Sequence, residues 1–312
     1  MSRSHPWEVS DALWERVIPL IPPPPSHARG GRPRMPDRQA FAASVYVLRT
    51  GIQWNALPRA LGASSTVHDR FQEWEQKGFF LRLWQAGLQV YDELEGIQWE
   101  WQAVDGAMTK APLGKSATGA NPTDRGKKGT KRSLLTDGAG IPLAIVIDGA
   151  NRHDVKLLCA TLDGIVIARS EPTEERPQHL CLDAGYDGAP AYQEVETRHY
   201  VPHIRSRGEE KQEKVLTPGY RARRWVVERT HSWINRSRRL LVRSREKRGE
   251  LPRFPSPCLC SIDLCQNPGF RISSKIAYLF SRVNQSLLAG RECICHCDSP
   301  CVWDCILLRR LQ

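Results

Sequence analysis

Hydrophobic positions in residues 6–95 recur at helical spacing. In WEVSDALWERVIPLI the apolar residues fall every three to four positions and stop at prolines 22–25, which predicts a first helix. RQAFAASVYVLRTG places Phe41, Val45 and Leu48 on one helical face, and Gly51 marks its end. We therefore expect residues 1–95 to form a small all-helical domain.

A second helical pattern in this region has the layout of a helix-turn-helix. LPRALGASSTVHDRFQEW predicts a helix, a glycine turn, serine caps at 64–65 and a second helix. Such a second helix can enter a major groove, which would bring His68 and Arg70 to DNA. The alternative is a helical hairpin that serves packing alone.

The segment RGGRPRMP (29–36) also has two interpretations. Gly, Arg and Pro in this arrangement can lie extended in a minor groove, with Arg32 and Arg34 directed inward. A basic linker with no DNA contact is the better explanation of so short a match.

From residue 98 the pattern changes to strands. GIQWEWQAVDGAMTK alternates and predicts a strand that ends at Asp105, followed by a Gly-, Lys- and Ser-rich loop at 111–131. RSLLTDGAGIPLAIVIDG predicts a β-hairpin, because two apolar runs flank DGAG at 137–140. After the hairpin, the pattern predicts a helix, a strand, a second helix, a second strand and finally a basic helix at 222–243. The order predicts a layered α/β domain over residues 96–246.

The net charge of +11 is concentrated near the end of this domain. Residues 200–250 contain 15 Lys and Arg against 6 Asp and Glu, a balance that attracts phosphate backbones or an acidic membrane surface. The sequence has no run of 18 apolar residues and no apolar signal core at its start, so we expect a cytoplasmic protein with no membrane segment.

Three carboxylates are candidates for a metal site. Asp105 and Asp183 each follow a predicted strand, and Glu228 is the single acid among eight arginines in 221–243. Strand ends in α/β sheets converge at one edge, and carboxylate oxygens are the ligands that Mg²⁺ or Mn²⁺ prefers. Two such ions could support phosphodiester displacement. Taken singly, each carboxylate fits a structural or solvated role better than a catalytic one, and Glu228 could form an internal salt bridge; the metal site depends on the combination of the three.

Helical geometry refines the surroundings of Glu228. Arg224 and His231 fall on its face of the helix, whereas Val226 and Trp233 fall on another face that we expect to be buried. Arg224 would then bind phosphate next to the metal.

Three segments together resemble a known family. VDGAMTKAP, LDAGYDG and RRWVVERTHSWINRSRRLL are similar to the signatures of bacterial insertion-sequence transposases of the Asp-Asp-Glu (DDE) type, closest to insertion sequence family five. The resemblance extends over about 6–243. It implies a ribonuclease-H-like catalytic domain, that is, a mixed sheet with flanking helices.

The resemblance implies the roles of individual residues. Asp105, Asp183 and Glu228 match the metal-binding triad, and Arg224 matches the signature arginine. The family places a Tyr where this chain has Arg221, and a Lys where it has Asn235 followed by Arg236. Arg221, Arg236 and Lys110 are therefore further candidates for DNA contact. His153 and Asp154 in NRHD match a recurrent family segment, for which a structural turn is the default interpretation.

The function implied is that of a transposase. It would bind the terminal inverted repeats of its element, hydrolyse a strand there, and join the 3′-hydroxyl to target DNA with two Mg²⁺ or Mn²⁺ ions. Such an enzyme acts as a homo-oligomer on DNA, associated with the bacterial nucleoid. Two rivals stay open: a metal-dependent nuclease without strand transfer, and a DNA-binding regulator with an inert catalytic fold.

The tail at 247–312 departs from everything before it. Eight of the ten cysteines lie between Cys258 and Cys305, in spacings that fit no regular pair of Cys-x-x-Cys hooks. A disulfide or zinc module is one interpretation. Another is a frameshift near 244–248, because RGELPRFPSPCL read one base later can encode GENYLAFLHLA, which resembles the family's next helix. The tail would then be out-of-frame translation, poorly ordered, with cysteines that carry no function, and the enzyme could be inactive.

Overall fold

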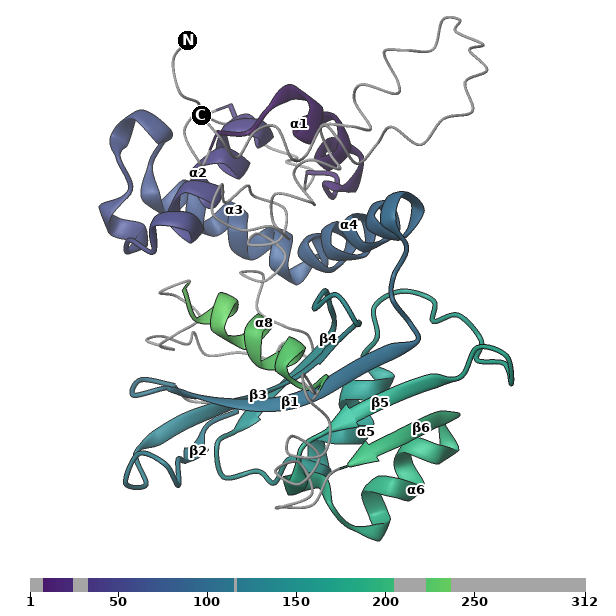
Figure 1. The fold of residues 1–312 in the computed structure, drawn as a ribbon. Coiled ribbons are helices and arrows are strands. Elements are labelled where there is room, and N and C mark those ends of the chain that lie inside the picture. Colours follow the sequence, from purple (N-terminus) through teal and green to yellow (C-terminus); the bar gives the residue numbers. More distant parts are fainter. Residues whose placement is uncertain (1–7, 25–32, 115–116, 205–222, 237–312) are drawn as a thin grey trace, which may run out of the picture.

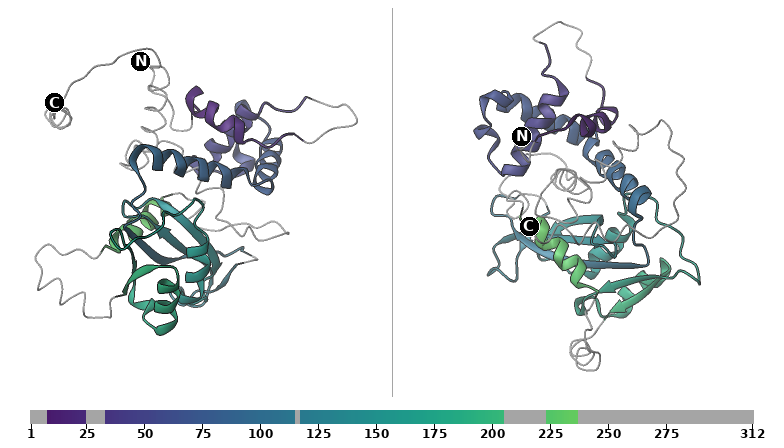
Figure 2. Two further views of the ribbon diagram at one scale, coloured as in Figure 1. Left: turned by 90° about the vertical axis from the view of Figure 1, so that its right-hand side faces the viewer. Right: turned by 45° about the horizontal axis from the view of Figure 1, so that its top comes forward.

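The computed structural model describes residues 8–24, 33–114, 117–204 and 223–236 (Figure 1). The candidates Arg32 and Arg221 and the whole cysteine-rich tail lie outside these ranges. A helical region is stacked above a layered sheet, as the two further views show (Figure 2). Within the described residues, no helix is long and apolar enough to cross a membrane.

The helical region contains α1 (Asp11–Val17), α2 (Asp37–Thr50), α3 (Ser64–Gln76) and α4 (Phe79–Glu95). The predicted end of α2 is confirmed: Gly51 takes the left-handed conformation, with φ 70°, and its N–H donates to the Val47 carbonyl. Phe41, Val45 and Leu48 are buried on one face of α2, as their spacing predicts.

The helix-turn-helix prediction is wrong in its details. The segment before the turn forms only single 3-10 turns at Trp54–Ala56 and Arg59–Leu61, because Pro58 and Gly62 leave too few residues for an α-helix. The N-cap of α3 is Ala63, which makes no side-chain capping bond, and Ser64 is the first helical residue. In the structure α3 packs against α2 and α4.

The strands form one mixed sheet. They are β1 (Trp101–Lys110), β2 (Gly119–Ala120), β3 (Lys128–Thr136), β4 (Pro142–Gly149), β5 (Gln178–Leu182) and β6 (Tyr200–Ile204). Their order is β4-β3-β1-β5-β6, with short β2 also paired to β3. β4, β3 and β1 pair antiparallel, whereas β1, β5 and β6 pair parallel. This is the ribonuclease-H-like arrangement that the resemblance implies.

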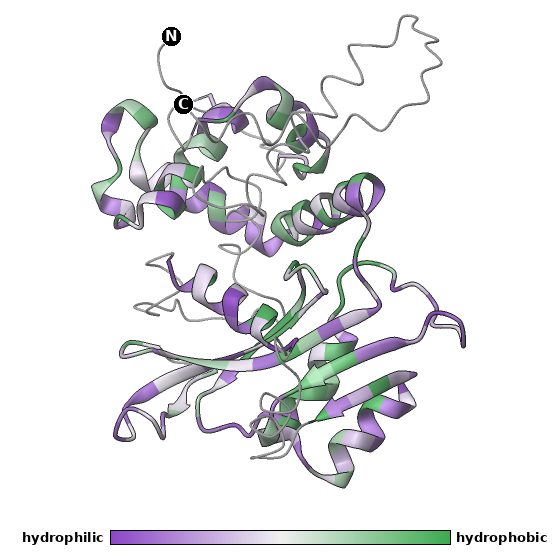
Figure 3. Ribbon diagram, viewed as in Figure 1, coloured by the Kyte–Doolittle hydropathy of each residue, from purple (hydrophilic) through white to green (hydrophobic). Residues whose placement is uncertain are grey.

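Helices flank both faces of this sheet. α5 (Val155–Asp163) and α6 (Ala189–Thr197) lie below it in Figure 1, and α8 (Trp225–Asn235) lies above it across β1 and β3. The predicted hairpin is confirmed, with β3 and β4 joined through residues 137–140. β4 and β5 are among the most hydrophobic strands (Figure 3), as expected of strands covered on both faces.

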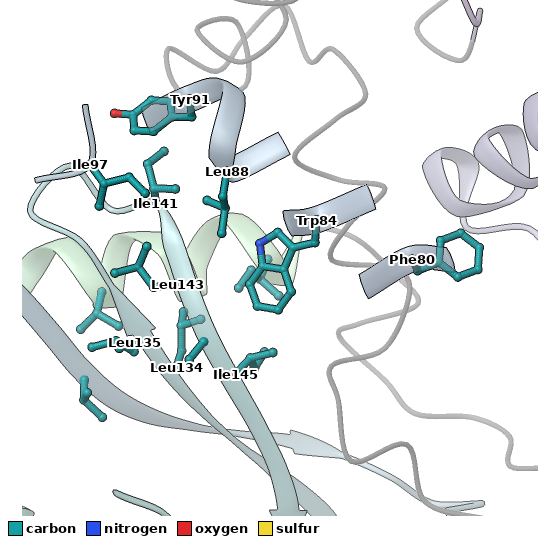
Figure 4. Close-up of a cluster of buried hydrophobic side chains, with 14 of the residues drawn as sticks. Phe80, Trp84, Leu88, Tyr91, Ile97, Leu134, Leu135, Ile141, Leu143 and Ile145 are labelled. Atoms are coloured by element: carbon teal, nitrogen blue, oxygen red, sulfur yellow. The ribbon is translucent and has the colours of Figure 1, made fainter. Parts of the chain in front are cut away.

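The helical region and the sheet share one hydrophobic core. Trp84, Leu88 and Tyr91 of α4 pack with Leu143 and Ile145 of β4 in a continuous buried cluster (Figure 4). The chain therefore has no break between two cores at 95/96, and the division into domains there stays a prediction.

Candidate active site

The first aspartate lies within a strand and not at its end. β1 continues five residues past Asp105 to Lys110, because β3 supplies backbone partners from Asp105↔Leu134 to Lys110↔Gly129. What does end near Asp105 is the parallel pairing of β1 with β5, whose last register pair is Ala103↔Cys181.

This register brings the two aspartates together. Asp105 and Asp183 each stand two residues beyond the pair Ala103↔Cys181, on neighbouring parallel strands. Asp183 directly follows β5, as predicted, and caps the 3-10 turn Ala184–Tyr186 by accepting a 2.7 Å hydrogen bond from the Gly185 N–H. The register therefore places the two aspartates at equivalent positions on neighbouring strands, although Asp105 itself is not at a strand end.

Glu228 is supplied from the face of the sheet that α8 covers. It lies in the first turn of α8, and Arg224 Nε donates to its carboxylate at 3.1 Å, so the predicted placement of Arg224 beside Glu228 is confirmed, and the two form the internal salt bridge that was the alternative interpretation. The Glu228 side chain is 52% exposed. An ion pair this exposed stabilises the fold little, so fold stability does not explain the pair.

The β3–β4 turn anchors the helix that carries Glu228. Thr230 Oγ1 donates to the Gly140 carbonyl at 2.9 Å, and Arg229 Nη2 donates to the Ala139 carbonyl at 2.6 Å. Asp137, fully buried, holds the turn by accepting hydrogen bonds from the Ala139 and Ile141 N–H groups. The turn therefore sets where Glu228 stands relative to the sheet.

We expect Gly140→Ala to displace α8. Gly140 has φ 91°, and a Cβ there would lie 2.9 Å from Arg229 Nη2 and 3.0 Å from Thr230 Oγ1. Strain and the disturbed contacts should together cost about 1–3 kcal/mol of unfolding free energy, measurable by urea denaturation. Gly126→Ala is the matched control, since Gly126 also has positive φ but nothing lies within 4 Å of its added Cβ. Equal losses for the two variants would contradict the anchoring role.

His231 projects from α8 towards the sheet, whereas Glu228 on the same helix is exposed. Its ring is buried, and Nε2 lies 3.2 Å from the Asp105 carbonyl oxygen, where it donates if protonated at that nitrogen. Burial and the Arg132 charge lower the pKa of His231 to about 4. Trp233 is only half-buried, whereas Val226, Val227 and Ile234 supply the apolar contacts of α8 with the sheet.

The buried neutral histidine predicts a pH-dependent stability. The pKa of His231 is 6.5 in the unfolded chain and about 4 in the folded chain. The stability that comes from keeping this histidine neutral is therefore complete above about pH 6.5, and it is lost as the pH falls from about 6.5 to about 4. We expect wild type to lose about 2 kcal/mol more than His231→Gln between pH 7 and pH 5 in urea denaturation. His153→Gln, at an exposed position, is the control. If the unfolding free energies of wild type and His231→Gln changed in parallel with pH, the low pKa of His231 would be contradicted.

The position at which the family carries a lysine is occupied differently here. Asn235 accepts a 2.6 Å hydrogen bond from Nη2 of Arg132, whose side chain is buried between β3 and α8. Burial lowers the pKa of Arg132 to about 10. Asn235 therefore ties α8 to the sheet, and Arg236 next to it is exposed.

The electrostatics of Asp105 indicate a site that favours a cation. Burial, with a smaller contribution from the charges of Asp183 and Glu228, raises the pKa of Asp105 to about 6, although the Gly106 N–H and the Arg224 charge act in the opposite direction. Within the described ranges, however, no three His, Cys, Asp or Glu side chains are gathered closely enough to hold a metal ion. The donor chemistry of the three carboxylates fits a hard divalent cation.

The NRHD segment forms the support behind the site. Asp154 Oδ2 forms an ion pair with Nζ of buried Lys131 at 2.8 Å, on the α5 side of the sheet. Its other oxygen, Oδ1, lies so close to Gly106 that a Cβ there would be 2.0 Å away. Sequence reasoning missed this contact, although the glycine after Asp105 was a usable signal for a close approach.

The candidate DNA-contact residues of the helical region are mostly engaged elsewhere. Arg70 is only 4% exposed and is paired with Asp37 and Glu73, so the prediction that it reaches DNA is not retained. Arg34 pairs with Glu73 at 2.7 Å. The His68 ring packs against Trp54, with ring centroids 4.9 Å apart.

Two family models match this chain. Residues 9–84 match the “Putative transposase of IS4/5 family”, and residues 101–251 match the “Transposase DDE domain”, so together they cover most of the sequence. The second match spans Asp105, Asp183 and Glu228. The chain belongs to the DDE insertion-sequence transposases.

Relatives of this DDE-family chain come from insertion elements. It is 38% identical over 141 residues to the “Putative transposase for insertion sequence element IS402” of Burkholderia cepacia, covering 44% of this chain and 64% of that protein. It is also 31% identical over 107 residues to an uncharacterized 16.2 kDa protein of the same element, covering 33% of this chain and 73% of the relative. The chain thus spans just under two thirds of the IS402 transposase's length.

Solved structures similar to this DDE-family chain include Mos1 transposase complexes. The Mos1 strand transfer complex gives a TM-score of 0.29 at 13% identity, covering 86% of this chain and 82% of that chain. The Mos1 paired end complex with Mn gives a TM-score of 0.25 at 12% identity, covering 69% of this chain and 81% of that chain. Scores this low support no conclusion, and the fold assignment depends on the strand order.

Proposed function

We propose that this chain is a DNA transposase that binds the ends of its element, hydrolyses a strand there and transfers the freed 3′-hydroxyl to target DNA. The observation that carries the proposal is the in-register placement of Asp105 and Asp183 on parallel strands, with Glu228 presented from α8. The family membership supports the same conclusion.

Asp105, Asp183 and Glu228 would hold two divalent ions, Mg²⁺ or Mn²⁺. Bound there, the ions would supply Lewis-acid activation of the attacking oxygen and stabilisation of the leaving oxygen. The protein's own contribution is placement. The β1–β5 register fixes the two aspartates, His231 contacts the backbone of Asp105, and the β3–β4 turn fixes α8.

Arg224 would exchange partners during this process. Its guanidinium pairs with Glu228 at 3.1 Å in the structure. If Glu228 joined the metal ligands, the Arg224 guanidinium would bind a phosphate beside the scissile bond, since guanidinium groups match phosphate geometry. Arg236, Lys110, Arg34, Arg32, Arg221 and His68 are proposed as further contacts to DNA.

We place the homo-oligomeric transposase on DNA in the bacterial nucleoid, because two element ends must be held together. The family match ends at residue 251, close to the expected frameshift at 244–248, which supports out-of-frame translation of 247–312. Sequencing the gene with its flanks tests this, since inverted repeats and a restorable GENYLAFLHLA frame are expected. A gene whose codons cannot encode that string would rule the frameshift out.

A nicking and joining assay separates this function from its two rivals. Labelled element-end DNA is incubated with plasmid target and Mg²⁺, using both the chain as it stands and the frame-restored version. Nicked ends plus joined product support a transposase, and nicking without joining indicates a nuclease. Equal DNA binding by wild type and Asp105→Ala, with no cutting in either or in the restored frame, indicates an inert regulator.

A further inference from the structure

A group of exposed basic residues lies at the far end of the sheet from β5 and β6. We define the basic rim as Lys110, at the end of β1, with Arg125, Lys127 and Lys128, around the turn between β2 and β3 (Figure 1). All are exposed, and the Lys110 side chain is 68% exposed. Among the residues that the structure describes, the one acid paired with the rim is Asp124, 3.7 Å from Lys110. The rim therefore presents a strong net positive charge.

The turn that carries the rim is held rigidly. Asn121, only 4% exposed, donates its N–H to the Lys127 carbonyl at 2.8 Å, and its own carbonyl accepts from the Gly126 N–H at 2.9 Å. Its side-chain oxygen accepts from the Thr123 N–H at 3.0 Å. Arg125 has φ 53°, a conformation uncommon for a residue with a side chain. Rigid cations bind with a smaller loss of conformational entropy than cations on a mobile loop.

The same strand connects the rim to the candidate metal site. Asp105 and Lys110 are five residues apart on β1, which is about 16 Å at 3.3 Å per residue. The β1–β3 ladder is paired without interruption from Ala103↔Thr136 to Lys110↔Gly129, so this separation is fixed. A distance of about 16 Å corresponds to roughly five base pairs of B-DNA.

We propose that the basic rim is a second DNA-contact surface, which holds the phosphate backbone of duplex DNA about five base pairs from the scissile phosphate. The inference depends on the proposed function, since the DNA is that enzyme's substrate. Lysine and arginine on an exposed rim bind phosphates without reading bases, so the contact is independent of sequence. It positions the duplex and leaves recognition of the element ends to other residues.

The test neutralises the rim in the full chain with Arg125→Gln, Lys127→Gln and Lys128→Gln together. Binding to an element-end duplex is measured without metal over a range of salt. Each lost phosphate contact reduces the salt slope by about 0.9, so the slope should become less negative by roughly 2–3, with affinity lower by about 10-fold or more at moderate salt. Hydroxyl-radical protection about five base pairs from the cut should also disappear.

The control neutralises exposed cations elsewhere, with Lys156→Gln on α5 and Arg176→Gln in the loop before β5. An unchanged slope and footprint in the rim variant, while wild type still binds and nicks, would overturn the rim assignment and leave the transposase proposal standing. Wild type with no affinity for duplex DNA would overturn both. A slope reduced as much by the control would show that general charge, and not the rim, holds the DNA.

Discussion

Glu228→Gln should lose Mg²⁺-dependent nicking of element-end DNA by on the order of 10³-fold, or about 4 kcal/mol in the activation barrier. The change keeps the size of the side chain and removes the charge that completes the metal site. Because Glu228 is 52% exposed and its pairing with Arg224 contributes little to stability, the fold should be unaffected. The measurement is the initial nicking rate in a frame-restored enzyme of demonstrated activity.

Ser232→Ala is the matched control, one turn further along the same helix and also exposed. It should retain the wild-type rate, and both variants should bind DNA and unfold as wild type does. A Glu228→Gln enzyme that keeps more than a tenth of the activity would show that the carboxylate is not a metal ligand.

Asp105→Asn should make the metal-free protein more stable at pH 8. Burial and the neighbouring Asp183 and Glu228 raise the pKa of Asp105 to about 6 in the fold, above its ordinary value of 3.8. The folded chain therefore holds this proton more tightly than the unfolded chain, and the resulting stability is lost as pH rises from about 4 to about 6. At pH 8 with chelator, the variant should gain about 1–3 kcal/mol of unfolding free energy.

The difference in unfolding free energy between Asp105→Asn and wild type should disappear as pH falls towards 4. Excess Mg²⁺ should reverse its sign, because the metal stabilises only the wild type. Leu113→Asn, an exposed position outside the site, is the control for a new amide side chain. An Asp105→Asn variant that is less stable than wild type in chelator at pH 8 would show that Asp105 has an ordinary structural role.

Local signals in the sequence predicted much of the fold. Gly51 ends α2 because only glycine takes its left-handed conformation without strain, and the DGAG turn joins two apolar runs of β-branched and aliphatic residues. The alternation around Asp105 correctly predicted a strand. Its end was mistaken because the length of β1 is set by pairing with β3, which is distant in sequence.

What the sequence did not reveal around the site has the same origin. His231 was expected beside Glu228 on an ideal helix face, and its spacing did not show that the sheet lies so close under α8 that the ring is buried against Asp105. Arg70 was expected to contact DNA, but in the fold it is buried and paired with Asp37 and Glu73. Helical spacing gives a residue's direction and does not reveal which element lies there. The three carboxylates stay a prediction as a metal site, which the equivalent positions of Asp105 and Asp183 on neighbouring parallel strands support.

The most direct test of the central claim is a count of Mn²⁺ ions bound by the protein, measured from the free-ion EPR signal with element-end DNA present. We expect two ions for wild type, and weakened binding with fewer ions for Asp105→Asn and Glu228→Gln. Ser232→Ala should match wild type. Equal Mn²⁺ binding by wild type and by a variant that lacks all three carboxylates would contradict the metal site, and with it the proposed chemistry.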